Sequence, residues 1–232
     1  ADGSSESPSD PGFALNNFVE IDTDGDGDVD DSDQDCGDLP NIELDKEFVS
    51  ATALGDGTYD VVYNVEVSNN GGVEGSYTLS DTPDFDNDVV INSGGFAGAL
   101  AFGGGTFAGD FTPPTGTQTL VTNQIIPAGG TDSYTITYNV TLELYSDGSN
   151  PGGDDIYTPC QGGQEEGVTG TPGTGLYNRA DLDVDGDGDN DVSDDDCGDL
   201  PLFDLALVKD VTSGTDPYEQ GDAVTYEVTV TN

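Results

Sequence analysis

Apolar and polar residues alternate with a period of two along much of the chain between Asn41 and Leu144. The alternation is clearest from Tyr134 to Leu144, where every second residue is apolar and the residues between them are polar. A run from Tyr59 to Val67 has the same pattern. Alternation of this kind is typical of antiparallel strands with one buried face. Because helix-type periodicity is absent throughout, the sequence predicts an all-β protein.

Shorter runs complete this pattern. They lie around Ile42–Phe48, Tyr77–Leu79 and Val89–Ile91, and turn signals rich in Gly, Pro and Asn separate them. The Gly-rich stretch of residues 93–110 fits either short strands or a loop held by its Phe side chains, and the pattern does not choose between the two. Roughly seven strand-like runs in about 104 residues have the size and spacing of an Ig-like antiparallel β-sandwich.

The chain also repeats itself. Residues 183–201 match residues 22–40 with numbers 161 higher, and residues 226–232 have the form of residues 63–69 with numbers 163 higher. A repeat this long indicates an array of domains. The predicted parts are a linker with a first calcium-binding loop and CGDLP (1–40), an Ig-like β-sandwich (41–144), a linker with a second calcium-binding loop (145–201) and the first two strands of another sandwich (202–232).

Residues 202–232 are too short for a sandwich of their own. Leu205 and Leu207 mark one predicted strand, and apolar residues alternate from Val224 to Val230 in the next. Two strands cannot bury their apolar face. Either the chain is an excerpt of a longer array, or a neighbouring subunit completes the second sandwich by strand addition.

The charge of the chain limits its partners. Against 48 Asp and Glu there are only three basic residues, which give a formal net charge of -45. This charge excludes nucleic acid and anionic membrane and favours cations. A disordered acidic chain is the alternative for such a composition, but the strand patterns argue against it. No apolar run approaches the roughly 18 residues that span a membrane, and no signal peptide opens the sequence, so membrane insertion is not expected.

Catalysis is not expected either. The chain contains no His, so general-base and nucleophilic chemistry would depend on carboxylates alone. A carboxylate-only glycoside hydrolase would need a paired acid with a raised pKa in an aromatic-lined cleft. We therefore predict that the protein is not an enzyme.

The two repeated stretches carry Asp at alternate positions, DTDGDGDVDDSDQD at 22–35 and DVDGDGDNDVSDDD at 183–196. Calcium takes about six to eight oxygen ligands, and a 12-residue loop supplies them at positions 1, 3, 5, 7, 9 and 12 with Gly at 6. Both stretches fit this pattern, with Gly27 and Gly188 at the turn. The predicted Ca²⁺ ligands are Asp22, Asp24, Asp26, Asp28, Asp30 and Asp33 in the first loop and Asp183, Asp185, Asp187, Asp189, Asp191 and Asp194 in the second.

The two copies together select the register. A register that starts at Glu20 also fits the first loop, but in the second loop it places Val192, which has no side-chain oxygen, at position 12. Position 12 is Asp rather than the bidentate Glu of an EF-hand, and no amphipathic helix flanks either loop, so EF-hand architecture is not expected. Magnesium is a weaker alternative because it retains water ligands. The other alternative is a solvated charge run without an ion.

Two segments resemble the Ig-like conserved repeat that occurs in tandem in very large bacterial and archaeal surface proteins. They are residues 42–69 and 205–232, and residues 126–138 resemble the end of the same domain. The residues that carry the resemblance are Leu44, Lys46, Tyr63 and Asn69 in the first copy and Leu207, Lys209, Tyr226 and Asn232 in the second. The resemblance implies an extracellular stalk, adhesin or fibre component and brings no catalytic residues.

The acidic loops resemble the helix-free calcium loops of thrombospondin type 3 repeats and related bacterial stalks, whose DxDxDG runs also end near a cysteine. That resemblance implies room for a second ion in each acidic run. The carboxylates left for it are Asp31, Asp35 and Asp38 in the first copy and Asp195, Asp196 and Asp199 in the second.

Two of the three cysteines are predicted to form a disulfide. Cys160 and Cys197 enclose 36 residues, and a bridge between them would join the linker to the second acidic stretch. It would stabilise the fold by at most about 4 kcal/mol in the chain-entropy model. The position that corresponds to Cys160 in the first copy would precede residue 1, which favours an excerpt in which the partner of Cys36 lies before the given sequence. The alternatives are an intermolecular bridge or a free thiol.

Together these features predict a structural component of an extracellular microbial surface fibre or adhesin stalk, stiffened by Ca²⁺ at the junctions between its domains. Its expected partners are other copies of itself or adjacent repeats. The alternative is a calcium-dependent recognition module, in which the Gly- and Phe-rich loop of residues 93–111 binds a glycan or a host surface. A cluster of sugar-stacking aromatic residues would favour recognition, and repeated head-to-tail contacts would favour the fibre.

Overall fold

The computed structural model describes residues 15–98, 106–107, 115–144, 152–154, 156–161, 170–202, 206–213 and 220–231. The chain forms two compact units, residues 1–200 and residues 201–232, which we describe separately. Within the described ranges the regular elements are all strands, which confirms the predicted all-β class. That part of the chain also contains no helix long and apolar enough to cross a membrane.

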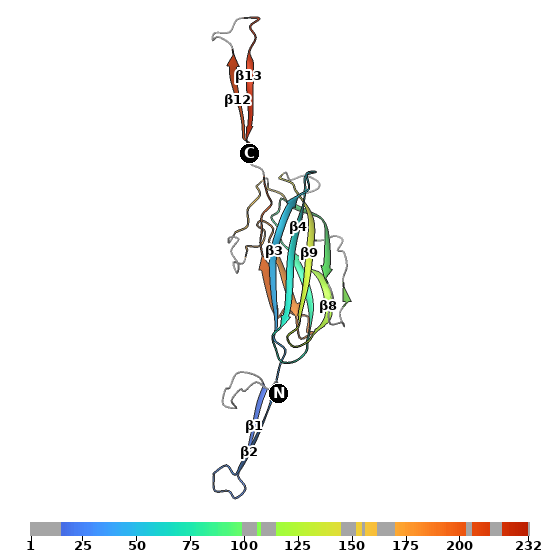
Figure 1. Cartoon of the computed structure of the whole chain (residues 1–232), viewed down its shortest axis with the longest axis vertical. Helices are drawn as coiled ribbons and strands as arrows, with labels where there is room; N and C mark the ends of the chain where they lie inside the picture. The colour runs from blue at the N-terminus through green and yellow to red at the C-terminus, as the bar shows by residue number, and fades with distance from the viewer. Residues whose placement is uncertain are drawn as a thin grey trace. The chain divides into compact units, whose positions relative to one another are not determined.

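The first unit contains a sandwich of two antiparallel sheets (Figure 1). One sheet has the strand order β3–β4–β9–β6, and the other has the order β11–β10–β5–β8–β7. The strands are β3 (Ile42–Ala53), β4 (Thr58–Asn69), β5 (Gly75–Pro83), β6 (Val89–Gly98), β7 (Thr106–Phe107), β8 (Gln118–Ile126), β9 (Thr131–Leu142), β10 (Asn178–Asp183) and β11 (Val192–Asp196). This architecture confirms the predicted antiparallel Ig-like β-sandwich.

The alternation in the sequence determines which side chains form the core. On β9 the residues at every second position from Tyr134 to Val140 are buried, and the same holds on β4 from Val61 to Val67. The facing sheet contributes the fully buried side chains of Tyr77, Leu79, Leu120, Ile126, Ala180 and Leu182. Apolar burial of this kind stabilises a fold by about 25 cal/mol per Å².

The second sheet also includes residues from the segment predicted as a linker. β10 pairs with β5 from Asn178↔Pro83 to Asp183↔Thr78, and β11 pairs with β10 at the edge of the sheet. The sandwich therefore extends beyond Leu144. The hydrophobic pattern of β10 is weak because only Ala180 and Leu182 place apolar side chains in the core.

The Gly-rich stretch contains strand residues at both ends of its described part. β6 continues to Gly98, whose backbone lies against a ring of the core: a Cβ there would be 2.4 Å from Cδ1 of Tyr134. Phe96 is buried and stacks on Tyr134 at a centroid distance of 5.2 Å. Thr106 and Phe107 form β7, whereas residues 99–105 and 108–114 lie outside the described ranges.

Two further hairpins lie in the described chain. β1 (Leu15–Ile21) pairs with β2 (Asp31–Gly37), where the sequence predicted a linker. In the second unit β12 (Ala206–Ser213) pairs with β13 (Thr225–Thr231), the two strands predicted there. Both hairpins form two-stranded sheets of their own.

Candidate metal sites in two acidic hairpin loops

Each acidic stretch forms the loop of a β-hairpin. Residues 22–30 connect β1 to β2, and residues 184–191 connect β10 to β11. In the first loop the Asp30 N–H donates to the Ile21 carbonyl at 2.9 Å, and in the second the Asp191 N–H donates to the Leu182 carbonyl at 2.8 Å. The same closing hydrogen bond therefore occurs twice, at positions whose numbers differ by 161.

The first Asp of each loop collects backbone N–H donors. In the first loop Oδ1 of Asp22 accepts from the Gly25 N–H at 2.6 Å, and Oδ2 accepts from the Gly27 N–H at 3.0 Å. The second loop repeats both bonds around Asp183, at 2.7 and 3.1 Å. Gly25 and Gly27 have φ values of 76° and 93°, in the left-handed region that favours glycine. These glycines allow the loop to wrap around the carboxylate.

Hydrogen bonds within the first loop favour the ionised form of two of its carboxylates. The N–H groups of Gly25 and Gly27 lower the pKa of Asp22, and the Thr23 hydroxyl and N–H lower the pKa of Asp30. The Thr23 N–H lies 2.6 Å from Oδ2 of Asp30. Ionised carboxylates are the form that binds a hard cation.

Three carboxylates converge in each loop. In the first loop one oxygen each from Asp22, Asp24 and Asp30 lie within 4.8 Å of one another. In the second loop the same holds for one oxygen each of Asp183, Asp185 and Asp187. The first two correspond to Asp22 and Asp24, whereas Asp187 corresponds to Asp26 and not to Asp30. All six residues belong to the predicted ligand sets, and a cluster of hard oxygens at this spacing can hold a metal ion.

The other predicted loop ligands lie in the same loops, and several of them cap backbone N–H groups. Oδ1 of Asp26 accepts from the Asp28 N–H at 2.9 Å, as Oδ1 of Asp187 does from Asp189 at 2.8 Å. Oδ2 of Asp191 accepts from the Val184 N–H at 2.9 Å. These contacts order the loop backbone around the converging carboxylates.

The residues predicted at position 12 lie in strands and not in the loops. Asp33 on β2 is opposite Val19, and Asp194 on β11 is opposite Ala180. Oδ2 of Asp194 accepts from the Lys46 N–H of β3 at 2.7 Å, a contact between the edges of the two sheets. Burial raises the pKa of Asp194. Neither residue belongs to the group of three converging carboxylates in its loop.

The carboxylates predicted for a second ion also fall in different surroundings. In the first copy Asp31 and Asp35 are exposed on β2, and Asp38 lies against Gly72, where a Cβ would be 2.2 Å from Oδ2 of Asp38. In the second copy Asp195 accepts from the Gly170 N–H at 3.1 Å.

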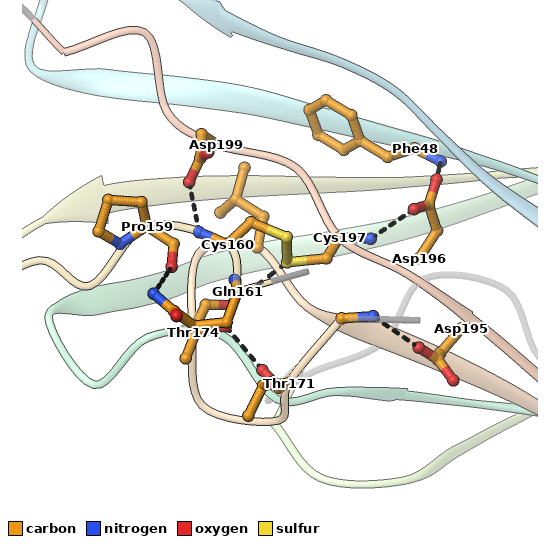
Figure 2. The surroundings of a disulfide bond; sticks show 12 residues. Phe48, Pro159, Cys160, Gln161, Thr171, Thr174, Asp195, Asp196, Cys197 and Asp199 are labelled. Carbon is orange, nitrogen blue, oxygen red and sulfur yellow. Dashed lines mark hydrogen bonds between the residues drawn. A yellow bond between two sulfur atoms is a disulfide. The ribbon is translucent and has the colours of Figure 1, made fainter. Parts of the chain in front are cut away.

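Asp196 and Asp199 each accept two hydrogen bonds. Figure 2 shows both bonds at Asp196 and the bond from Cys160 at Asp199. Asp196 accepts from the N–H groups of Phe48 and Cys197, at 2.6 and 2.7 Å. Asp199 accepts from the Tyr157 hydroxyl at 3.0 Å and from the Cys160 N–H at 2.8 Å. Both carboxylates therefore hold the second acidic hairpin to neighbouring segments of the sandwich.

The predicted disulfide between Cys160 and Cys197 is present, with a Cα–Cα distance of 5.9 Å (Figure 2). Cys197 is buried and directly follows β11 in the chain. The disulfide therefore fixes the end of the acidic hairpin to the segment around residue 160. Cys36, which corresponds to Cys197 in the first copy, is an exposed free thiol.

Sequence reasoning did not identify a buried acidic pair in the turn before β6. Asp86 and Asp88 are 2% and 0% exposed. Oδ1 of Asp88 accepts from the Asp154 N–H at 3.1 Å, while its Oδ2 is buried without a hydrogen-bond partner in the described structure. Burial raises the pKa of Asp88. The signal that could have found the pair is the alternation of Asp at 84, 86 and 88, as in the acidic loops.

No family model and no curated protein matches the chain. Among solved structures it is similar to the crystal structure of BcpA*(D312A), the major pilin subunit of Bacillus cereus. The two sequences are 12% identical, and the match covers 84% of this chain and 50% of that chain with a TM-score of 0.30. The chain thus spans half the length of that pilin, and a TM-score this low supports no transfer of function.

Proposed function

We propose that the chain is a non-catalytic structural segment of an extracellular microbial fibre or adhesin stalk, and that calcium bound in the acidic hairpin loops stiffens it. The observation that carries the proposal is the same loop formed twice, with three converging carboxylates each time. Calcium is the cation we favour because the cluster offers several hard oxygen atoms of the protein, and magnesium seldom uses an all-protein cage.

The position of the second loop supports a role at a domain junction. β10 ends at Asp183, opposite Thr78 near the start of β5. At that start Gly75 lies against Pro40, where a Cβ would be 2.8 Å from Cβ of Pro40. The second acidic loop therefore lies at the end of the sandwich where the chain enters from residue 40. An ion there would stabilise the part of the domain that meets the preceding segment.

Electrostatics supports the same role. With a net charge of -45, the acidic loops repel one another and the rest of the chain, and a bound divalent cation reduces this repulsion. The disulfide supports an oxidising, extracellular location because such bonds persist there. The recognition alternative depends mostly on residues outside the described ranges, and no contact of the described residues favours it.

Calcium titration tests the proposal. The chain is titrated calorimetrically with CaCl₂ and with MgCl₂, and its melting temperature and scattering dimensions are compared in calcium and in chelator. We expect calcium binding and a higher melting temperature, because each site adds about 2.7 kcal/mol when calcium exceeds its Kd by about 100-fold. The scattering measurements should also show a narrower range of chain dimensions in calcium than in chelator.

Matched variants assign the sites. The pair Asp183→Asn and Asp185→Asn should remove one ion and most of the gain in sandwich stability, whereas Asp22→Asn and Asp24→Asn should remove one ion with little effect on the sandwich. Glu47→Gln with Glu66→Gln removes the same charge from exposed positions on β3 and β4 and should retain both ions. Equal melting curves in calcium and in chelator would rule out the stiffening role.

A further inference from the structure

The sandwich contains a lysine buried in its core. Lys46 lies on β3 of the four-stranded sheet, and its side chain is 0% exposed. Its Nζ contacts Oδ1 of Asp81, which lies on β5 of the five-stranded sheet and is also 0% exposed. The chain has only three basic residues, and this one connects the two sheets across the core.

The surroundings of this pair are aromatic. Nζ of Lys46 lies 5.1 Å from the ring centroid of Tyr63, which in turn packs edge-to-face on Phe48 at 5.6 Å. The Tyr138 hydroxyl donates a hydrogen bond to Oδ2 of Asp81. Both oxygens of the carboxylate are therefore engaged, one by the amine and one by a phenol.

A buried ion pair of this kind is weakly favoured as a pair of charges, because the desolvation penalty opposes the attraction between them. Burial lowers the pKa of Lys46, although the charges of Asp81, Asp194 and Asp181 oppose that shift. Transfer of one proton from Nζ to the carboxylate gives a neutral amine in contact with a neutral carboxylic acid. A neutral amine is a nucleophile, and here it is held against the carboxyl group.

We propose that Lys46 and Asp81 condense to form an intramolecular isopeptide bond between the two sheets. Nζ of Lys46 attacks Cγ of Asp81 and forms the C–N bond. The bond from Cγ to Oδ1 then breaks, and Oδ1 leaves as water with two protons from the original ammonium group. Oδ2 remains as the amide oxygen, and the Tyr138 hydroxyl that donates to it stabilises the negative charge of the tetrahedral intermediate.

The resulting bond would complement the disulfide. It ties β3, the first strand of the sandwich, to β5, while the Cys160–Cys197 bridge ties the segment after β11 to the segment around residue 160. Lys209 provides an internal comparison because it corresponds to Lys46 in the second unit but is exposed, with Nζ 4.4 Å from the ring centroid of Tyr226. We expect it to remain a free amine.

Mass spectrometry of the reduced, denatured chain tests the bond. The expected mass is about 18 Da below the sequence mass, because one water is lost. Trypsin should cut after Arg179 and Lys209 but not after Lys46, so residues 1–179 should remain one fragment. A chain of full sequence mass that trypsin cuts after Lys46 would overturn the proposal.

Two variants exclude other causes of a water loss, such as succinimide formation at the Asp-Gly sequences of the loops. Asp81→Ala should have its full sequence mass and be cut after Lys46. Asp81→Asn keeps an acyl group, and its condensation should release ammonia, about 17 Da, and give the same product as the natural chain. Because the samples are prepared in chelator, the result is independent of calcium. A water loss that persists in Asp81→Ala would assign the loss to another site and overturn the proposal.

Discussion

The hairpins β3–β4 and β12–β13 have the same strand register, but the first has a buried face in the sandwich and the second is a two-stranded sheet whose apolar residues are exposed. Leu44 is opposite Val67 in the first, and Leu207 is opposite Val230 in the second. Both hairpins shift register at the same place, between residues 48 and 50 and between residues 211 and 213. Yet Val67 is 0% exposed, and Val230 is 61% exposed.

The acidic hairpins form a second pair of this kind. Residues 17 and 35 are opposite each other in β1–β2, as residues 178 and 196 are in β10–β11. Ile21 is 52% exposed, whereas the corresponding Leu182 is 0% exposed because β10 also pairs with β5. Local sequence thus sets the strand pairing and the bulge, while the rest of the sandwich supplies the burial.

Hydrogen exchange should give the largest difference between these regions. We expect amides shared by β4 and β9 to exchange only through global unfolding, because β4 is paired on both sides and covered by the second sheet. Amides of β12–β13 should exchange about 1,000-fold faster or more, since an isolated two-stranded hairpin is marginally stable. Val65 and the corresponding Val228 are the residues to compare.

The measurement uses dilute chain, so that contacts between molecules are minimised. Equal protection at Val65 and Val228 would mean that β12–β13 is stable without a second sheet. Protection of β12–β13 that grows with concentration would instead indicate that another copy covers it.

A matched truncation in the two hairpins should give the next largest difference. Val67→Ala removes two methyl groups from the core and should lower the free energy of unfolding by about 2 kcal/mol. Val230→Ala changes the corresponding exposed residue and should change it by less than about 0.5 kcal/mol. Urea unfolding followed by tyrosine fluorescence measures both, because the chain contains 10 Tyr and no Trp. Similar losses in both variants would contradict the assigned difference in burial.

The sequence predicted these features unequally. Alternation over many residues identified β4 and β9, because a long period-two pattern leaves little ambiguity. It did not identify β10 and β11, whose side chains are mostly polar. β10 joins the sheet by pairing with β5, and β11 joins it by pairing with β10. Non-local pairing of this kind leaves almost no local signal.

The candidate sites show the same contrast between local contacts, which the sequence predicted, and non-local contacts, which it did not. The spacing of Asp and Gly identified the residues that converge in each loop, because those contacts form within about ten residues. It could not show that Asp194 binds the backbone of Lys46, 148 residues away in the chain. The sequence also could not predict the contact of Lys46 with Asp81 across the core, because neither residue belongs to a motif that implies the other.

The smallest expected effect is on the pH dependence of stability and concerns Asp194. Burial raises the pKa of Asp194 above the ordinary value of 3.8, although the Lys46 N–H opposes the shift. The folded chain therefore binds this proton more tightly than the unfolded chain, and stability falls as the pH rises from about that value through the raised pKa.

Asp194→Asn removes the titration and keeps an oxygen acceptor for the Lys46 N–H, so stability should fall less over this pH range. The difference should be well below about 1 kcal/mol, because partial exposure to solvent screens the charge. Urea unfolding in chelator at a series of pH values compares this variant with the natural chain, and equal slopes for the two would show that this carboxylate does not titrate with folding.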